Sequence, residues 1–335
     1  MTRVALDRPA RAAAQRLRRW ARANRLVGNV LYDSRNADEF SDPLEHERML
    51  ADRTRVDAYD QAIARHVRAG DVVVDLGTGT GILALLAARQ GAEVHAVDHS
   101  PFISVARRIA DHHGLAVTFH QQNSRDFTPP APVDLVVHEQ LGDDCFDENM
   151  VENLLDLKRR VLAPGGRILP GRFELYVEPV MLHESFVVPY LWEQRVAGLD
   201  LSFLRDDDEL AGYERPHHHT HHLHPGAVAG FLADPRPLLV VDLHDIDDPS
   251  DIATSHTVTR TVTSGGRLDG FCVHFRAIFD DDLSITTSPT ATRTHWGNRF
   301  FRTPARDCAP GDEIAYAVEL TPLTRGRSWT VTTVG

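Results

Sequence analysis

Residues 71–90 read DVVVDLGTGTGILALLAARQ, and this stretch decides the fold. Up to Leu76 it is a run of β-branched apolar residues, which is typical of a strand buried on both faces of a parallel sheet. Gly77, Gly79 and Gly81 follow, and then an apolar segment with a helical composition. Glycines let the backbone turn tightly and bring N–H groups at a helix N-terminus close to a ligand. The stretch therefore predicts a strand, a ligand-binding turn and a helix.

Further strand and helix units follow in the first half of the chain. Strands are predicted at 93–98, 116–122 and 133–139, helices at 103–113 and 148–162, and a closing turn at 163–166. Repeated βαβ units predict a Rossmann-like, doubly wound, mostly parallel sheet that binds ligands at the carboxyl ends of its strands. Asp98 ends the second strand, where an acid can accept hydrogen bonds from a ribose diol.

The second half has a different pattern. Strands of alternating character are predicted at 172–180, 238–246, 255–263, 270–279, 312–323 and 328–334. Turn residues separate several of them, which predicts an antiparallel β-barrel or sandwich. We expect an N-terminal helical segment at 1–48, a Rossmann-like domain at 49–170 and a β-barrel domain at 171–335.

Residues 187–225 interrupt the strands with a helical, aromatic segment, PYLWEQ, and then polar sequence. We expect a projecting helical arm that buries Trp192, Leu199, Leu201 and Phe203 against a second subunit of a homodimer. The alternative is a local subdomain that packs within its own chain.

The composition excludes several kinds of partner and indicates a cellular compartment. The formal net charge of −12 argues against nucleic acid, whose phosphates need a basic surface. No apolar run reaches the ~18 residues of a membrane span. Three scattered cysteines without a CxxC pattern favour neither disulfides nor zinc. Lys158 is the only lysine beside many arginines, a bias that suggests a GC-rich bacterial source and hence the cytoplasm. The basic stretch 8–26 indicates a solvated helix rather than a transit peptide.

The glycine turn also indicates which nucleotide binds. A dinucleotide fingerprint would need glycine at position 82, where Ile82 stands. The G-x-G-x-G spacing preceded by Asp75 resembles motif I of class I S-adenosylmethionine-dependent methyltransferases. The alternative is a structural turn without a ligand. The cofactor-binding residues we expect are Arg55, Asp75, Gly77, Gly79, Gly81, Asp98 and Ser124.

Residues 139–150 read EQLGDDCFDENM, with Glu139 and Glu148 nine positions apart. Two ionised carboxylates facing one pocket repel each other unless a cation lies between them. The segment resembles the double-glutamate loop of the protein arginine N-methyltransferases. Met49–Arg55 is similar to a helix of that family, and Thr294–Trp296 is similar to its Thr-His-Trp loop, as the motifs follow in the same order.

The resemblance implies a role for each of these motifs. Glu139 and Glu148 would hold a guanidinium, which is planar, permanently charged and forked. Asp52 and His295 would provide a route for the surplus proton, with Glu148 as the other route. Substrate-binding residues would be Met49, Met150, Trp296 and Tyr32. A sulfonium is already a good leaving group, so no metal site is expected.

Departures from the family pattern in two segments leave the identity of the acceptor open. Gln140, Asp143 and Asp147 stand where the family has aromatic residues, and of its N-terminal Tyr-Phe-x-x-Tyr pattern only Tyr32 keeps a ring. The acceptor could therefore be an arginine-containing protein or peptide, free arginine or a small guanidinium compound. The acids from Asp143 to Asp147 could hold a free α-amino group, although such runs are usually solvated.

Two rival functions remain at this stage. One is a natural-product N- or O-methyltransferase with a non-guanidinium acceptor. The other is a non-catalytic protein that only senses the cofactor. The histidine cluster at 217–224 could bind a metal, but it has no acid or cysteine partner in register, so an exposed loop is favoured.

Overall fold

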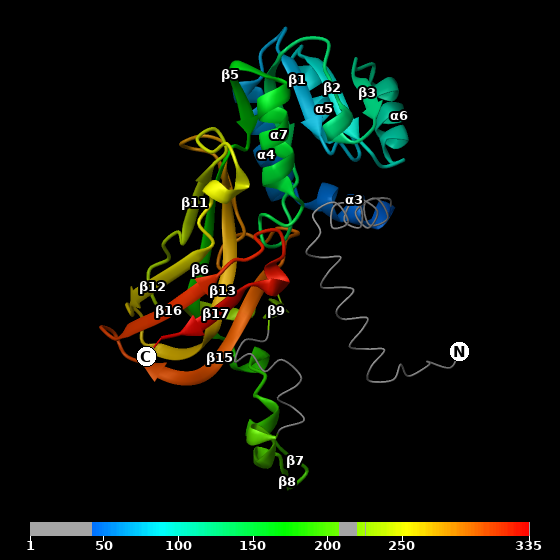
Figure 1. Ribbon diagram of the computed structural model, residues 1–335. Coiled ribbons are helices and arrows are strands. Elements are labelled where there is room, and N and C mark those ends of the chain that lie inside the picture. The colour runs from blue at the N-terminus through cyan, green and yellow to red at the C-terminus, as the bar shows by residue number, and fades with distance from the viewer. Residues whose placement is uncertain (1–41, 208–219, 225, 335) are drawn as a thin grey trace, which may run out of the picture.

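The computed structural model describes residues 42–207, 220–224 and 226–334. A parallel sheet and an antiparallel domain lie side by side, and the chain passes from one to the other near Pro170 (Figure 1). Most of the predicted N-terminal helical segment, residues 1–41 with the basic stretch 8–26 and Tyr32, lies outside the described residues. Within the described parts, none of the helices is both long and apolar enough to cross a membrane.

The first domain is the predicted doubly wound sheet. Its strands are β1 (Val72–Leu76), β2 (Glu93–Asp98), β3 (Thr118–Gln121), β4 (Val133–His138) and β5 (Leu162–Leu169). They run parallel in the order β3-β2-β1-β4-β5. The helices are α3 (Pro43–Ala51), α4 (Arg53–His66), α5 (Ile82–Arg89), α6 (Ile103–His113) and α7 (Met150–Arg160). Strand order reverses between β1 and β4, and ligands bind beside such a switch point.

Two local predictions for this domain were wrong. Residues 163–166 do not form a closing turn, because they lie inside β5, where the pairing with β4 shifts register after Val133. The segment Met49–Arg55 is not one helix. Asp52 separates α3 from α4 and caps α4 by accepting a hydrogen bond from Arg55 N at 3.0 Å. This break turns the Asp52 carboxylate toward the second domain.

The second domain is antiparallel, as predicted. One sheet has the order β10-β6-β13-β15-β9, with β11 on β6 and β14 on β13, and the other has the order β12-β16-β17. The strands are β6 (Arg172–Leu182), β9 (Thr220–Leu223), β10 (Val228–Phe231), β11 (Leu239–Asp242), β12 (Ser255–Thr261), β13 (Gly266–Ile278), β14 (Ser284–Thr286), β15 (Asn298–Cys308), β16 (Glu313–Glu319) and β17 (Thr330–Thr333). Phe271 and Tyr316 pack between the sheets, with ring centroids 4.5 Å apart.

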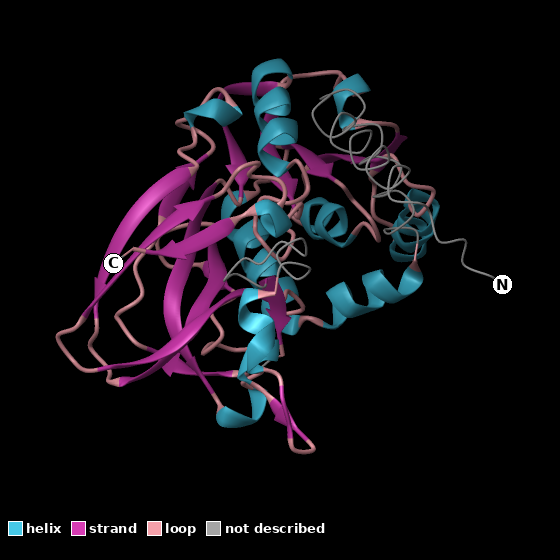
Figure 2. Ribbon diagram, turned by 60° about the horizontal axis from the view of Figure 1, so that its bottom comes forward, coloured by secondary structure: helices cyan, strands magenta, loops and turns pink. Residues whose placement is uncertain are grey.

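The arm projects away from the barrel, and β7 (Arg195–Val196) and β8 (Leu199–Asp200) form its tip (Figures 1 and 2). The expected helix is one 3₁₀ turn, Leu191–Glu193, because the chain then enters the β7–β8 hairpin, where Ala197 and Gly198 have left-handed φ angles. Leu199 and Phe203 are 69% and 70% exposed. Of the histidine cluster, residues 217–219 lie outside the described residues.

Candidate active site

The glycine turn at the end of β1 is closed by two carboxylates. Asp98 accepts a hydrogen bond from Gly79 N at 2.8 Å, and Gly79 has a left-handed φ of +51°. Asp75 accepts from Thr78 Oγ1 at 2.6 Å and from Ala84 N at 3.0 Å. Burial raises the pKa of Asp75 to about 7. Its second oxygen, Oδ1, is buried without a hydrogen-bond partner in the described part of the chain. The two carboxylates therefore fix the shape of the turn, since Asp98 binds the Gly79 N–H and Asp75 is buried.

Helix α3 covers this turn with a residue that sequence reasoning missed. His46 is buried and stacks on Phe102, with ring centroids 3.8 Å apart. A Cβ at Gly79 would lie 3.0 Å from His46 Cε1, so the turn and α3 approach each other closely. The only sign of this role in the sequence is that His46 lies one helical turn before Met49, which places both residues on one helix face.

Arg55 on α4 and Glu139 after β4 form a buried ion pair. Arg55 Nη1 lies 2.6 Å from Glu139 Oε2, and the side chains are 6% and 10% exposed. Burial raises the pKa of Glu139, and Arg55 partly offsets this. Arg55 Nη2 donates to Met49 O at 3.0 Å, while Nε is buried with no hydrogen-bond partner among the described residues. The structure thus joins a predicted cofactor residue to a predicted catalytic one.

Asp52 and His295 are brought together from opposite domains, as the motifs implied. His295 Nδ1 lies 2.9 Å from Asp52 Oδ2, and His295 N donates to the same oxygen at 2.8 Å. Burial raises the pKa of Asp52, but the hydrogen bonds from His295 and Arg55 outweigh it and hold this pKa below its usual value. The carboxylate is therefore charged at neutral pH and fixes the imidazole ring.

A neutral histidine holds the end of β4. Burial lowers the pKa of His138 to about 4. Its Nε2 therefore donates to Pro170 O at 2.9 Å, and Nδ1 accepts from Gln140 N at 3.4 Å. Tyr59 donates its hydroxyl to His138 O at 2.8 Å. Glu139, which follows His138, thus leaves a backbone that is fixed on both sides.

The loop after Glu139 is attached to the barrel through its polar groups. Trp296 Nε1 donates to Leu141 O at 2.6 Å, and Gly297 N donates to Asp143 Oδ1 at 2.6 Å. Asp144 is buried and forms a bidentate ion pair with Arg299 on β15. Asp144 is therefore neither solvated nor free to bind an α-amino group, whereas the Asp143 side chain is still 38% exposed.

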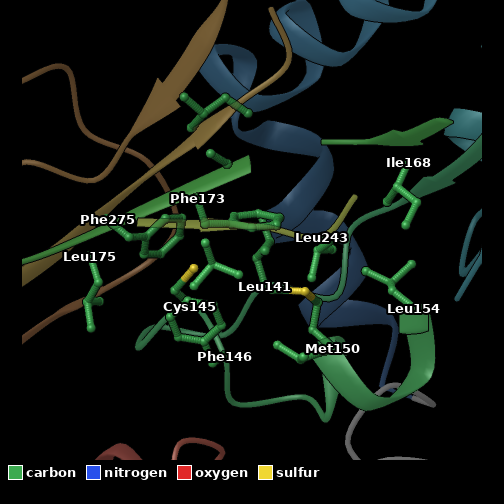
Figure 3. Packing of buried hydrophobic residues seen from close by; sticks show 14 of the residues in the cluster. Leu141, Cys145, Phe146, Met150, Leu154, Ile168, Phe173, Leu175, Leu243 and Phe275 are labelled. Carbon is green, nitrogen blue, oxygen red and sulfur yellow. The ribbon is translucent and has the colours of Figure 1, made fainter. Parts of the chain in front are cut away.

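The apolar side chains of the same loop enter the core. Leu141, Cys145 and Phe146 pack toward Phe173 and Phe275 of the barrel strands (Figure 3). Phe146 and Phe173 are 6.3 Å apart between ring centroids, at an interplanar angle of 70°. The loop therefore belongs to both domains. Asp147, between Phe146 and Glu148, is mostly buried near Asp144, and burial raises its pKa to about 7.

The remaining predicted site residues lie in different surroundings. Glu148 is half-buried in the turn before α7. Met150, the first residue of α7, is fully buried in the core (Figure 3). Met49 is half-buried near the end of α3, and Ser124 begins a 3₁₀ turn and accepts from Arg160 Nη2 at 2.9 Å. In the described part of the chain, no three metal-ligating side chains converge. The roles of these residues stay predictions.

Comparisons with known proteins agree with this geometry. A family described as "Methyltransferase domain" matches residues 73–166. The "Probable protein arginine N-methyltransferase 6" of Arabidopsis thaliana is 32% identical over 177 residues, which are 51% of this chain and 40% of that protein. The "Protein arginine N-methyltransferase 6" of Danio rerio is 26% identical over 269 residues, covering 77% of this chain and 76% of the relative.

The chain is thus similar in sequence to protein arginine N-methyltransferases. A solved Trypanosoma brucei PRMT1 enzyme–prozyme complex with AdoHcy has a TM-score of 0.71 at 21% identity and covers 84% of this chain and 88% of its own. Arabidopsis thaliana protein arginine methyltransferase 10 has a TM-score of 0.69 at 23% identity, with 84% and 89% covered. The predicted resemblance to that family and the predicted fold class are confirmed.

Proposed function

We propose that the protein transfers a methyl group from S-adenosylmethionine to a nitrogen of a guanidinium. S-adenosylmethionine would supply the methyl group on a sulfonium, which needs no further activation as a leaving group. Arg55 would hold its carboxylate, Asp98 its ribose diol, and the backbone N–H groups of the glycine turn would face it. Asp75 and Ser124 complete the proposed cofactor site.

Two observations support the fit of this cofactor. Arg55 Nε is a buried donor without a partner among the described residues, and a buried unsatisfied donor costs about 1–3 kcal/mol. An anionic ligand at Arg55 would remove that cost. A side chain at Gly79 would press on the His46 ring that covers the turn, and glycine lets the backbone of the turn approach a ligand closely.

The observation that carries the acceptor assignment is that Glu139 already binds a guanidinium, that of Arg55, at 2.6 Å. The carboxylate is buried, Arg55 offsets part of the rise that burial causes in its pKa, and it lies at the switch point of the sheet. A second carboxylate from Glu148 would hold the acceptor from the other side. Holding the planar head at two edges would orient one nitrogen for attack.

The proton that the acceptor nitrogen loses needs a base. Asp52 fixes the His295 ring through Nδ1 at 2.9 Å, which leaves Nε2 as the free position of the ring to take a proton. Glu148 is the alternative acceptor. Met49 and Trp296 would line the acceptor stem, whereas Met150 is fully buried in the core. Tyr32, which the family resemblance also implies, lies outside the described residues.

The finer parts of the proposal concern partner and assembly. We infer an arginine-containing peptide or protein, free arginine or a small guanidinium compound as acceptor, because Gln140 and Asp143 replace bulky aromatic residues beside the site. The domain division at residue 170, the arm at about 187–225, a homodimer built on that arm and a cytoplasmic location belong to the same proposal.

The test is methyl transfer with the wild-type protein and its Glu148→Gln variant, followed by mass analysis of the acceptor. We expect the wild type to add methyl groups to guanidinium nitrogen and the variant to lose turnover while its cofactor affinity stays. Transfer to a hydroxyl or amine that survives both Glu148→Gln and Glu139→Gln would instead favour a natural-product methyltransferase. Binding of S-adenosylmethionine without transfer to any guanidinium compound would favour a cofactor sensor.

A further inference from the structure

The segment between the two glutamates is attached to the barrel by a buried ion pair. Arg299 Nε donates to Asp144 Oδ1 at 2.6 Å, and Arg299 Nη2 donates to Asp144 Oδ2. The side chains are 5% and 1% exposed. On its other side the Asp144 carboxylate is enclosed by the turn at Gly326, where a Cβ would overlap it. The pocket is therefore built to the size of an aspartate.

A buried ion pair of this kind fixes the relative orientation of the two segments that it joins more than it adds to the free energy of unfolding. Well-packed apolar side chains of the same volume are often as stable as a buried ion pair or more so. A bidentate arginine–carboxylate pair, however, has a fixed planar geometry that apolar contacts lack. Leu141, Cys145 and Phe146 already bury the loop, so the ion pair adds an orientation to a segment that is held in the core in any case.

Each member of the pair is close in sequence to one residue of the proposed acceptor site. Asp144 is four residues before Glu148, and Arg299 is four residues after His295. Glu139 is fixed separately by β4 and Arg55. The position of Glu148 relative to Glu139 therefore depends on what holds the loop between them.

We propose that Asp144 and Arg299 are positioning residues that set the place of Glu148, and of the His295 loop, relative to Glu139. This inference rests on the proposed guanidinium methyl transfer. Neither residue touches the acceptor in this scheme. Each acts through the backbone that it holds, together with the Gly297 N bond to Asp143.

The barrel offers a matched control. Glu178 and Arg260 also form a buried bidentate pair, at 2.9 and 3.1 Å, with side chains 0% and 11% exposed. They join β6 to β12, outside the loop. Arg299→Lys and Arg260→Lys each keep the charge and remove the planar fork. A merely structural role would give the two variants the same enzymatic behaviour.

The experiment measures kcat, the acceptor KM, the cofactor Kd and the Tm of the full chain, with free arginine and an arginine-rich peptide as acceptors. We expect Arg299→Lys to lower kcat by about 10- to 100-fold, because small misplacements of reacting groups have effects of that order. Its cofactor Kd stays within about twofold. Arg260→Lys lowers Tm comparably and keeps kcat within about twofold of the wild type.

Equal kcat in the two variants would overturn the inference. Hydrogen exchange at residues 140–149 gives a readout that needs no acceptor, and Arg299→Lys should speed exchange there while Arg260→Lys should not. If the wild type methylates no guanidinium, the proposed function fails. Exchange then decides the inference by itself, since an unchanged loop in Arg299→Lys would show that the pair does not position it.

Discussion

Replacing Glu139 by glutamine should destabilise the protein and raise its affinity for the cofactor, because Arg55 no longer has to give up a charged partner to bind the cofactor's carboxylate. The change removes the charge that lies 2.6 Å from Arg55 Nη1 in a pair only 6% and 10% exposed. Removing one partner of a buried ion pair costs about 3–5 kcal/mol. The amide keeps one oxygen that can accept from Arg55, so we expect about 3 kcal/mol.

The assay is thermal unfolding with and without S-adenosylmethionine. At about 2–4 °C per kcal/mol, Glu139→Gln should lower Tm by about 6–12 °C without the cofactor. Saturating cofactor raises Tm of both proteins by mass action, and it should narrow the gap between them because its carboxylate would replace the missing partner of Arg55. The Arg55→Leu variant serves as the control, since it loses that binding partner and should lose cofactor affinity.

The result that would refute this reasoning is a loss of cofactor affinity by Glu139→Gln as large as that of Arg55→Leu. A gap in Tm that is the same with and without cofactor would also contradict it. Either outcome would mean that Arg55 does not exchange Glu139 for an anionic ligand.

Two further predictions concern the proton route and the glycine turn. Asp52→Asn should cost about 1–3 kcal/mol of unfolding free energy, because the charged acceptor of two His295 bonds is lost. Folding lowers the pKa of Asp52 below 3.8, so its contribution to the free energy of unfolding is fully present above that pH and disappears as pH falls through the folded-state pKa. The difference in unfolding free energy between the two proteins, measured from pH 3 to 7, should therefore shrink only at the acid end. A difference that grows there would contradict the assignment. Gly79→Ala should weaken cofactor binding, measured by calorimetry, since its Cβ would lie 3.0 Å from His46. Gly114→Ala is the control, because Gly114 has a similar positive φ and a Cβ there would have nothing within 4 Å. It should cost about 1 kcal/mol of backbone strain and leave cofactor binding unchanged.

The parallel sheet could be predicted from sequence because its strands are buried on both faces. Runs such as VVVDL and VDLVVH are apolar at nearly every position, as strands covered on both faces are, and the glycine turn marks the carboxyl end of β1. The predicted Asp52–His295 contact is present in the structure although the two residues are 243 positions apart. That prediction came from motif order rather than from any local pattern.

Strand β15 and the acidic loop could not be predicted in the same way. Residues 298–308 read NRFFRTPARDC, with four consecutive exposed positions and a proline, so no alternation marks the strand. Asp144 looked solvated because its partner, Arg299, is 155 residues away. From the local sequence one can infer that burying such a charge is costly, but not that a residue distant in sequence compensates it.

Methyl transfer with labelled S-adenosylmethionine tests the central claim most directly. The acceptors are free arginine, an arginine-rich peptide and a whole-cell lysate, and mass analysis locates the added methyl group. We expect label on a guanidinium nitrogen with the wild type and none with Glu148→Gln, at equal cofactor occupancy. Label on a hydroxyl or amine that persists in Glu148→Gln and Glu139→Gln would contradict it.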